Sequence, residues 1–437
     1  MEWQLLLLLL FGGLIVLMAT GMPVAICFIL INLIGRFFFF GGLAGLEHFS
    51  TSIFDSVTSF VLLPIPLFIL MGEVMFQSGI ASPMMDALDK WLGRLPGRLG
   101  LQAVAGGAIL STLTGMDLAT TAIMGDALVP EMEKRGYKKA MTMGPILGSG
   151  GLAIMIPPSD LAVLLGALGK ISIGKLLMAI IFPGILMGAL YATYIIVRSI
   201  LQPAIAPAYG VTHFSLSDKL LATARYILPI GFVIFAVVGL ILFGIATPTE
   251  AAATGAISMF LLSAAYGRLN WQVAKKSLMG TLHITGMIML ILAGAVAFSQ
   301  ILAFSGASRG LIGFATTLPL SPIFILIAML VIILFLGAFM EPVSIMMVTL
   351  PLFMPIVNNL GFDPVWFGVI YLLSITMGEI SPPFGLCLFV MKGVAPPDTT
   401  IGDVYRAGLP FLGLDLIAIV LLIAFPQISL WLPGVMR

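Results

Sequence analysis

The chain has 437 residues, of which 60% are hydrophobic and only 9% are charged. An ordinary soluble domain has about 25% charged residues, so this composition excludes a soluble enzyme, a disordered regulator and a nucleic-acid-binding protein. One helical crossing of a hydrocarbon layer about 30 Å thick needs about 20 apolar residues. The sequence therefore predicts an all-α polytopic membrane protein embedded in a lipid bilayer.

Apolar stretches separated by Gly, Pro or charged residues follow one another along the chain. Two of them, 98–133 and 320–358, are interrupted near the middle and predict hairpins that enter and leave the membrane on one side. The first stretch has no Lys or Arg ahead of it, so we interpret it as a membrane helix rather than a cleaved signal peptide. The ten expected crossings are 3–19, 23–40, 61–78, 138–168, 175–198, 226–246, 251–266, 277–303, 363–391 and 406–431.

The basic residues are distributed unevenly between the two sides that this count defines. An excess of Lys and Arg marks cytoplasmic loops, so both termini are expected to face the periplasm of a bacterial inner membrane. One side holds only Arg36, Lys170, Lys175, Arg309 and Arg437. The other side holds Lys90, Arg94, Arg98, Lys134, Arg135, Lys138, Lys139, Arg198, Lys219, Arg225, Arg268, Lys275, Lys276, Lys392 and Arg406.

The chain also matches itself at an offset of 225 residues, which pairs Pro157-Pro158 with Pro382-Pro383 and Pro130 with Pro355. Each copy holds five crossings and one hairpin, and the odd number predicts two inverted repeats, a feature of secondary transporters. The first repeat, 1–205, has scaffold helices 1–80, an arm 82–98, a hairpin 98–135, a broken helix 138–168 and a helix 175–198. A cytoplasmic linker, 206–225, precedes the second repeat, 226–437, with scaffold helices 226–303, an arm 305–318, a hairpin 320–358, a broken helix 363–391 and a helix 406–431.

Three amphipathic stretches, 47–59, 82–98 and 307–318, lie between these apolar segments. Such helices lie in the membrane interface. They are either arms that connect a fixed part to a moving part or surface linkers without a mechanical role.

Four interruptions predict the functional site. Two are hairpin tips, 111–117 and 337–342, and two are helix breaks, 148–159 and 378–383. Glycine tolerates unusual dihedrals and proline removes a backbone donor, so a Gly cluster followed by Pro-Pro opens a helix and frees carbonyls. Freed carbonyls and hydroxyls suit an alkali cation, and helix N-termini suit an anion. The alternative is that these breaks are kinks packed against neighbouring helices.

Asp117 and Glu341 stand at the two tips, where an ionised acid at membrane depth costs about 2.5 to 3.5 kcal/mol. Each either ligates a cation or caps the second helix of its hairpin. Glu250 reads as a helix cap, and Glu379 is a weaker candidate. Cys27 and Cys387 lie in apolar runs far apart, which predicts small buried side chains without a disulfide. The sequence contains no catalytic constellation or nucleotide-binding motif, so no enzyme is expected.

The chain resembles the large membrane subunit of the tripartite ATP-independent periplasmic (TRAP) transporters over nearly its whole length. The resemblance rests on Leu128-Val129-Pro130-Glu131-Met132 with Lys134-Arg135-Gly136-Tyr137, Ile156-Pro157-Pro158-Ser159 with Ile171-Ser172-Ile173-Gly174-Lys175, Thr247-Pro248-Thr249-Glu250-Ala251-Ala252, Gly337 to Glu341, and Pro382-Pro383-Phe384-Gly385-Leu386-Cys387-Leu388-Phe389.

The resemblance implies sodium as coupling ion, an elevator movement, a small four-helix membrane subunit and a periplasmic solute-binding protein. The implied ion sites surround Gly115 with the first Pro-Pro break, and Gly337 to Glu341 with the second. The first tip usually reads Gly-Ser-Ser, whereas this chain has Gly115-Met116-Asp117, and Glu379 replaces a usually apolar residue. The binding candidates are Ser111, Thr114, Gly115, Asp117, Thr120, Gly150, Pro157, Pro158, Ser159, Gly337, Glu341, Ser344, Gly378, Ser381, Pro382 and Pro383.

Together these features predict a sodium-driven importer of a small organic acid delivered by a soluble binding protein. A stand-alone ion-coupled anion carrier is the main alternative, and it needs no binding protein. A channel is a second alternative, and it would not accumulate solute against a gradient.

Overall fold

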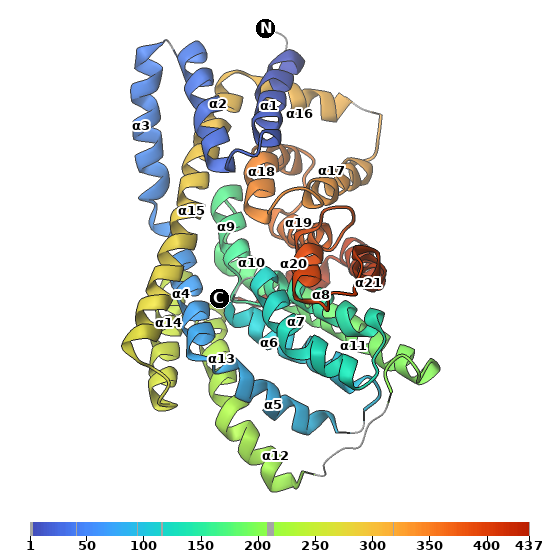
Figure 1. The fold of residues 1–437 in the computed structure, drawn as a ribbon. Helices are drawn as coiled ribbons and strands as arrows, with labels where there is room; N and C mark the ends of the chain where they lie inside the picture. The colour runs from blue at the N-terminus through green and yellow to red at the C-terminus, as the bar shows by residue number, and fades with distance from the viewer. Residues whose placement is uncertain are drawn as a thin grey trace.

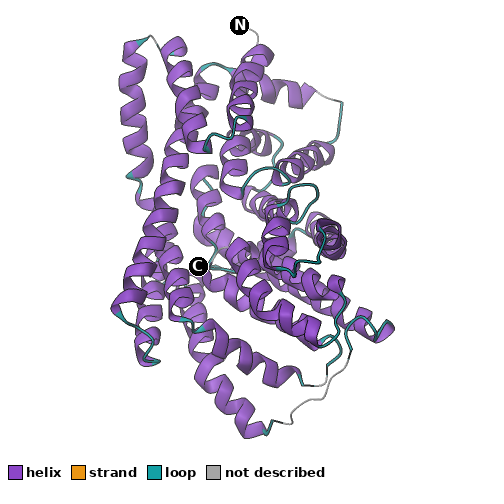
Figure 2. Cartoon of the chain, in the orientation of Figure 1, coloured by secondary structure: helices purple, strands orange, loops and turns teal. Residues whose placement is uncertain are grey.

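A computed structural model describes residues 3–40, 42–93, 95–114, 117–207, 214–317 and 319–436. Throughout these ranges the regular elements are helices, joined by turns and short loops (Figure 2). The all-α fold class predicted from the sequence is therefore confirmed.

One group of helices comes from the beginnings of the two halves of the chain. The long helix α15 packs against α2, α3 and α4, and α4 also packs against α14. Figure 1 shows these helices along one side of the molecule. The group consists of α1 (Trp3–Ala19), α2 (Val24–Phe39), α3 (Leu43–Val57), η1 (Phe60–Leu62), α4 (Pro64–Ser78), α12 (Leu216–Ala222), η2 (Thr223–Ile227), α13 (Leu228–Leu242), α14 (Pro248–Ala265) and α15 (Trp271–Phe304).

A second group comes from the ends of the two halves. Its first members are α5 (Ala81–Leu92), α6 (Arg98–Thr114), α7 (Asp117–Lys134), α8 (Lys139–Met155), α9 (Asp160–Gly169), α10 (Ile173–Ala179) and α11 (Ile181–Leu201). Its later members are α16 (Ala307–Thr317), α17 (Pro322–Gly337), α18 (Pro342–Asn359), α19 (Pro364–Glu379), α20 (Leu386–Val394), α21 (Ile401–Ala424) and α22 (Gln427–Val435). Helix α8 packs against α6, α7 and α21, so the two halves share one interior.

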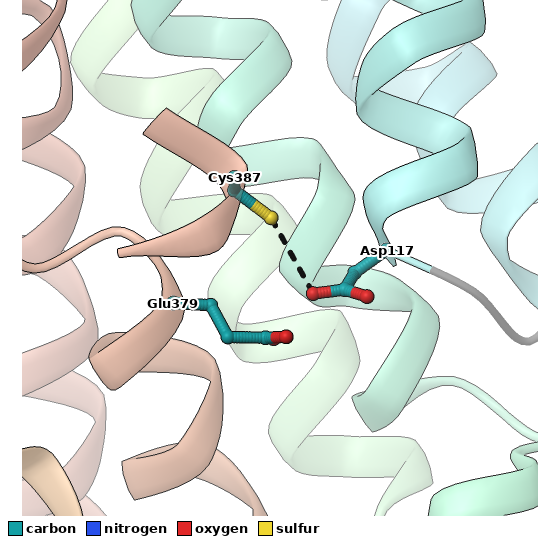
Figure 3. A group of neighbouring side chains, drawn as sticks. All are labelled: Asp117, Glu379 and Cys387. Atoms are coloured by element: carbon teal, nitrogen blue, oxygen red, sulfur yellow. Dashed lines mark hydrogen bonds between the residues drawn. The ribbon is translucent and has the colours of Figure 1, made fainter. Parts of the chain in front are cut away.

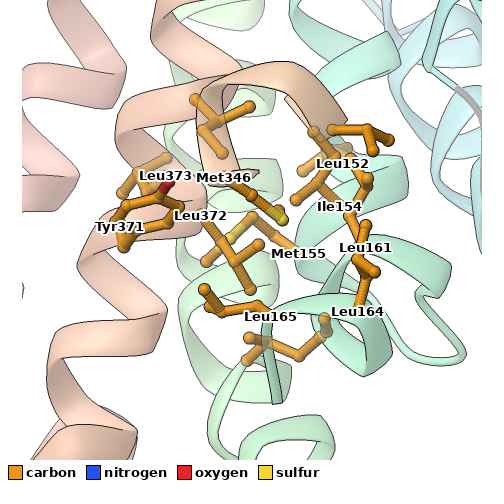
Figure 4. Close-up of a cluster of buried hydrophobic side chains, with 14 of the residues drawn as sticks. Leu152, Ile154, Met155, Leu161, Leu164, Leu165, Met346, Tyr371, Leu372 and Leu373 are labelled. Atoms are coloured by element: carbon orange, nitrogen blue, oxygen red, sulfur yellow. The ribbon is translucent and has the colours of Figure 1, made fainter. Parts of the chain in front are cut away.

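The buried core of this second group is apolar and joins the two halves directly. Figure 4 shows Met155 of α8 and Leu165 of α9 among Met346 of α18 and Leu372 of α19. All four are within 1% of full burial. Fully burying one such side chain contributes about 1.5 to 3 kcal/mol, so this cluster holds the broken helices together.

Helix boundaries follow local capping chemistry. Thr247 and Glu250 form a capping box at the start of α14, with the Glu250 backbone N–H donating to Thr247 Oγ1 at 3.3 Å. The interpretation of Glu250 as a cap is therefore confirmed. Asp363 accepts from the backbone N–H groups of Val365 and Trp366 at the start of α19, at 2.8 and 3.0 Å.

Among the described residues, six helices are long and apolar enough to cross a membrane, and a seventh counts if the bent pair α8–α9 forms one span. Five further apolar helices have 10–17 residues. Several expected crossings are thus shorter than a full span, because Gly and Pro divide the apolar runs into helices of about four turns.

A buried acid joins α11 to α21. Asp415 Oδ1 accepts a hydrogen bond from the Tyr191 hydroxyl, while Asp415 Oδ2 has no partner among the described residues. We expect Tyr191→Phe to lower the free energy of unfolding by about 1 to 3 kcal/mol, because Asp415 Oδ1 then loses its hydrogen-bond donor and stays buried. Titration with sodium dodecyl sulfate in mixed micelles measures this change. Tyr194→Phe on the same helix is the control and should stay within about 0.5 kcal/mol of the parent; equal effects of both changes would contradict the assignment.

Candidate functional site

The first break lies at the prolines and not at the preceding glycines. Helix α8 runs without interruption through Gly148–Gly151 to Met155, and the chain then bends by 45° before α9 begins at Asp160. The prediction that the glycine cluster opens this helix is therefore wrong. The glycines serve close packing instead, because a Cβ on Gly151 would collide with the Thr376 side chain of α19.

The second break, like the first, lies at a Pro-Pro pair between the end of one helix and the start of the next. Helix α19 ends at Glu379, and α20 begins at Leu386. The Pro157–Pro158 and Pro382–Pro383 peptide bonds are both cis. The Tyr405 hydroxyl donates to the Pro383 carbonyl, so α21 holds part of this break.

Ser159 caps the helix that follows the first break. Its Oγ accepts from the backbone N–H of Ala162 at 3.3 Å, and its side chain is fully buried. We expect Ser159→Ala to lower the free energy of unfolding by about 1 kcal/mol, and Ser159→Gly by only a few tenths, because glycine tolerates the N-cap position. Unfolding in mixed micelles separates the two values. Equal losses for Ala and Gly would show that the hydroxyl does not stabilise α9 as a cap.

The first hairpin tip places Asp117 at the start of α7. Asp117 Oδ1 accepts from the Leu118 backbone N–H at 2.7 Å, and Asp117 is buried together with Thr120. Gly150 of α8 packs closely here, since a Cβ at that position would stand 2.5 Å from Thr121 Oγ1. Gly115 lies outside the described residues, as do the side chains of Ser111 and Thr114.

The second hairpin tip places Glu341 at the N-cap of α18. The Glu341 carboxylate accepts from the backbone N–H groups of Val343 and Ser344, at 3.2 and 2.9 Å, and from the Ser344 hydroxyl at 2.6 Å. Of the two roles open from the sequence, the capping geometry is present.

The tip and the break of the second half touch through glycine. Gly337 ends α17, and Gly378 lies next to the last residue of α19. A Cβ on either glycine would stand 2.6 Å from the Cα of the other. The backbones therefore approach more closely than any larger residue allows, which ties the second tip to the second break.

Glu379 follows Gly378 directly and is almost completely enclosed, with 1% of its surface exposed. Neither of its carboxylate oxygens has a hydrogen-bond partner among the described residues. Gly385 closes the turn over its backbone, because a Cβ at Gly385 would stand 2.5 Å from the Glu379 carbonyl oxygen.

The structure brings the acids of the two tips and two breaks together. The charges close enough to act on Glu379 are all negative and belong to Asp117, Glu341 and Asp160. The ion pairs of the described residues use other acids, at Asp89, Glu131, Asp398 and Asp403. These four acids come from both halves of the chain, and none of them forms an ion pair among the described residues, an arrangement that attracts cations.

The hydrogen bond that the Ser381 side chain makes is to its own break and not to the acidic group. Its Oγ donates to the Pro382 carbonyl at 3.4 Å, and Pro383 is exposed. The second break is thus partly open, whereas Pro157, Pro158 and Ser159 of the first break are enclosed or nearly so.

A cavity of about 370 Å³ separates the first group of helices from α9 and α18. Its polar lining includes Asp55, Ser56, Ser299 and Gln300 from the first group and Lys170, which follows α9. Met347 of α18 contributes apolar surface. A site with one cationic and one acidic side chain, hydroxyls and apolar walls suits a small amphipathic solute.

Comparisons with known proteins agree with this architecture. The chain is 33% identical over 385 residues to the C4-dicarboxylate TRAP transporter large permease protein DctM of Pseudomonas aeruginosa, covering 87% of this chain and 88% of that protein. It is 28% identical to the sialic acid TRAP transporter large permease protein SiaM of Vibrio cholerae, covering 95% of this chain and 96% of that protein. The solved structure of the YdaH transporter of Alcanivorax borkumensis has a similar fold, with a TM-score of 0.68, 16% identity and coverage of 89% of this chain and 90% of that one.

The family model of the tripartite ATP-independent periplasmic transporter, DctM component, matches residues 11–428. This match spans both hairpins, both breaks and the four acids Asp117, Asp160, Glu341 and Glu379. The expectations of a transport protein rather than an enzyme, and of a membrane permease, are confirmed. The chain is a member of the DctM family of TRAP transporter large permeases.

Proposed function

We propose that this chain imports a small organic acid into the cell, driven by a sodium gradient. The observation that carries the proposal is that Asp117, Asp160 and Glu341 act electrostatically on Glu379 beside two hairpin tips and two helix breaks. None of the four acids forms an ion pair among the described residues. Such a site favours cations electrostatically. Sodium would be held by carbonyls and hydroxyls of the tips and breaks, with the acids supplying negative potential.

The substrate proposal rests on charge and on the relatives. Lys170 offers a cationic contact in the cavity between the two groups of helices, which Asp55 also lines, and two of the relatives are named for transport of C4-dicarboxylates and sialic acid. We therefore assign the cavity to a carboxylate-bearing substrate on its way to or from the tips.

The proposed movement is an elevator, in which the hairpins and broken helices carry the site past α4, α14 and α15. The amphipathic helices α5 and α16, each of which precedes a hairpin, are the proposed arms. The proposal includes inverted repeats, an inner-membrane location with both termini periplasmic, a small membrane subunit and a periplasmic solute-binding protein.

Uptake by proteoliposomes tests this proposal. The full chain is reconstituted with the proposed small subunit and solute-binding protein, and uptake of labelled C4-dicarboxylates and sialic acid is measured. We expect accumulation above the outside concentration only when sodium is outside and the binding protein is present. Choline in place of sodium is the matched control.

Each other outcome rejects part of the proposal. Sodium-driven uptake without the binding protein identifies a stand-alone carrier. Equilibration without accumulation identifies a channel, and accumulation that persists in choline excludes sodium as the coupling ion.

A further inference from the structure

Asp117, Glu379 and Cys387 form a compact group that we call the carboxylate–thiol cluster. One ligand atom from each residue lies within 4.8 Å of the other two, and all three side chains are buried. They come from α7, from the end of α19 and from α20, so the first hairpin tip meets the second break here. Figure 3 shows the Glu379 carboxylate and the Cys387 sulfur directed toward Asp117.

Part of the hydrogen-bonding capacity of the cluster is unused, namely that of Glu379. Cys387 Sγ donates to Asp117 Oδ2 at 3.4 Å, and Thr121 Oγ1 lies 3.9 Å from the same sulfur. Both oxygens of Glu379 lack a partner in the described part of the chain. A buried carboxylate without a partner is strongly unfavourable, so a ligand that contacts these oxygens gains more than it would at a solvated acid.

The chemistry of the donors identifies the class of ligand. The neighbouring charges are acidic, which excludes an anion and favours a cation. Carboxylates alone suit Na⁺, Mg²⁺ or Ca²⁺, which are hard cations that do not seek sulfur. A sulfur beside two carboxylates is the ligand set of a borderline divalent cation such as Zn²⁺, which binds Cys, His and Asp or Glu.

We propose that Asp117, Glu379 and Cys387 bind one divalent cation of the zinc class, using two of the four acids to which the proposed function assigns the attraction of sodium. The thiol ligates as thiolate and releases its proton to solvent, as metal-bound cysteines do. The bound ion joins α7 to α19 and α20 and so links elements of the two halves. This proposal does not depend on sodium coupling or on the identity of the substrate.

Binding of Zn²⁺ and Cd²⁺ to the purified full chain in detergent tests the proposal without any transport assay. Calorimetry with Zn²⁺ gives affinity and stoichiometry, and ultraviolet absorbance with Cd²⁺ reports thiolate coordination. We expect one Zn²⁺ per chain and a thiolate-to-Cd²⁺ charge-transfer band. Cys387→Ser should abolish the band and weaken Zn²⁺ binding at least tenfold. Glu379→Gln should also weaken Zn²⁺ binding at least tenfold, because losing even a group that supports a metal ligand lowers metal affinity about 10- to 100-fold.

The other cysteine provides the matched control. Cys27 is fully buried, and its thiol donates to the Met22 carbonyl at 3.6 Å, away from any metal-binding group of the described residues. Cys27→Ser should leave the band and the Zn²⁺ affinity unchanged. A second readout is thermal unfolding, because a ligand that binds the folded state raises the midpoint. Zn²⁺ should raise the midpoint of the parent and of Cys27→Ser, and not that of Cys387→Ser.

Three results would overturn the assignment. They are absence of the Cd²⁺ band in the parent chain, persistence of the band in Cys387→Ser, and loss of the band in Cys27→Ser with Cys387 intact. If Cys387→Ser does not fold, Glu379→Gln decides the matter: unchanged Zn²⁺ affinity in that variant rejects the site.

Discussion

Gly337→Ala is expected to abolish uptake and to lower the free energy of unfolding by about 1 to 3 kcal/mol, the usual cost of overpacking a core. The new Cβ would stand 2.6 Å from the Cα of Gly378. The atom it meets belongs to the backbone, so no side-chain rotation relieves the contact and α17 must move away from α19. Gly378→Ala should behave in the same way, because the contact is reciprocal.

Unfolding in mixed micelles and uptake by proteoliposomes measure the two effects. Gly413→Ala on α21 is the control, because a Cβ there meets nothing within 4 Å. That change should be neutral or stabilising by up to about 1 kcal/mol, the helix-propensity gain of Ala over Gly. Unimpaired uptake and stability in Gly337→Ala would contradict the close approach of the tip and the break.

Asp117→Asn is expected to raise the sodium concentration for half-maximal uptake at least tenfold, which corresponds to about 1.4 kcal/mol. The change keeps the shape of the side chain and its contact with the Leu118 backbone N–H, while it removes one carboxylate from the acidic group. Uptake measured against sodium at constant ionic strength gives this value. Asp126→Asn is the matched control, because Asp126 is exposed on the same helix.

Two substitutions of Glu341 separate the effect of its charge from the effect of its capping role at the second hairpin tip. Glu341→Gln keeps one acceptor oxygen, enough for the Ser344 backbone N–H, but loses the second acceptor and the charge, whereas Glu341→Ala loses the charge and both acceptors. Both variants should raise the sodium concentration for half-maximal uptake. Glu341→Ala, which loses the cap altogether, should also lower the free energy of unfolding by about 1 kcal/mol. Unchanged sodium dependence in Asp117→Asn and in both Glu341 variants would remove the acids from the ion site.

Much of the local structure is predictable because it depends on neighbours in the sequence. Thr247 and Glu250 lie three residues apart, so their reciprocal capping follows from helix geometry alone. The breaks at Pro157-Pro158 and Pro382-Pro383 follow from missing backbone donors. The glycines at 148–151 show the limit of this reasoning, since glycine permits both an open backbone and a closely packed helix, and only the neighbouring helices decide between them.

The site depends on contacts between residues that are far apart. Cys387 reads from the sequence as a small buried hydrophobe, and it is indeed buried and free of a disulfide. Its contact with Asp117 joins residues 270 positions apart, and no local pattern predicts it. Glu379 is recognisable in the sequence as a rare acid within an apolar run. That its carboxylate lacks a partner among the described residues is visible only once the surrounding helices are in place.

The sequence by itself determined the membrane environment, the helical class and the family of this protein. A composition of 60% hydrophobic and 9% charged residues indicates a bilayer, and a bilayer admits few backbone structures. The order of the motifs indicated the family. Only the tertiary structure decided which acids share one enclosure, that Glu341 caps α18, and that a thiol stands beside two carboxylates. The physical reason is that burial and charge neutralisation depend on distances through space. Packing of α7, α8, α19 and α20 sets those distances across more than 250 residues of intervening chain.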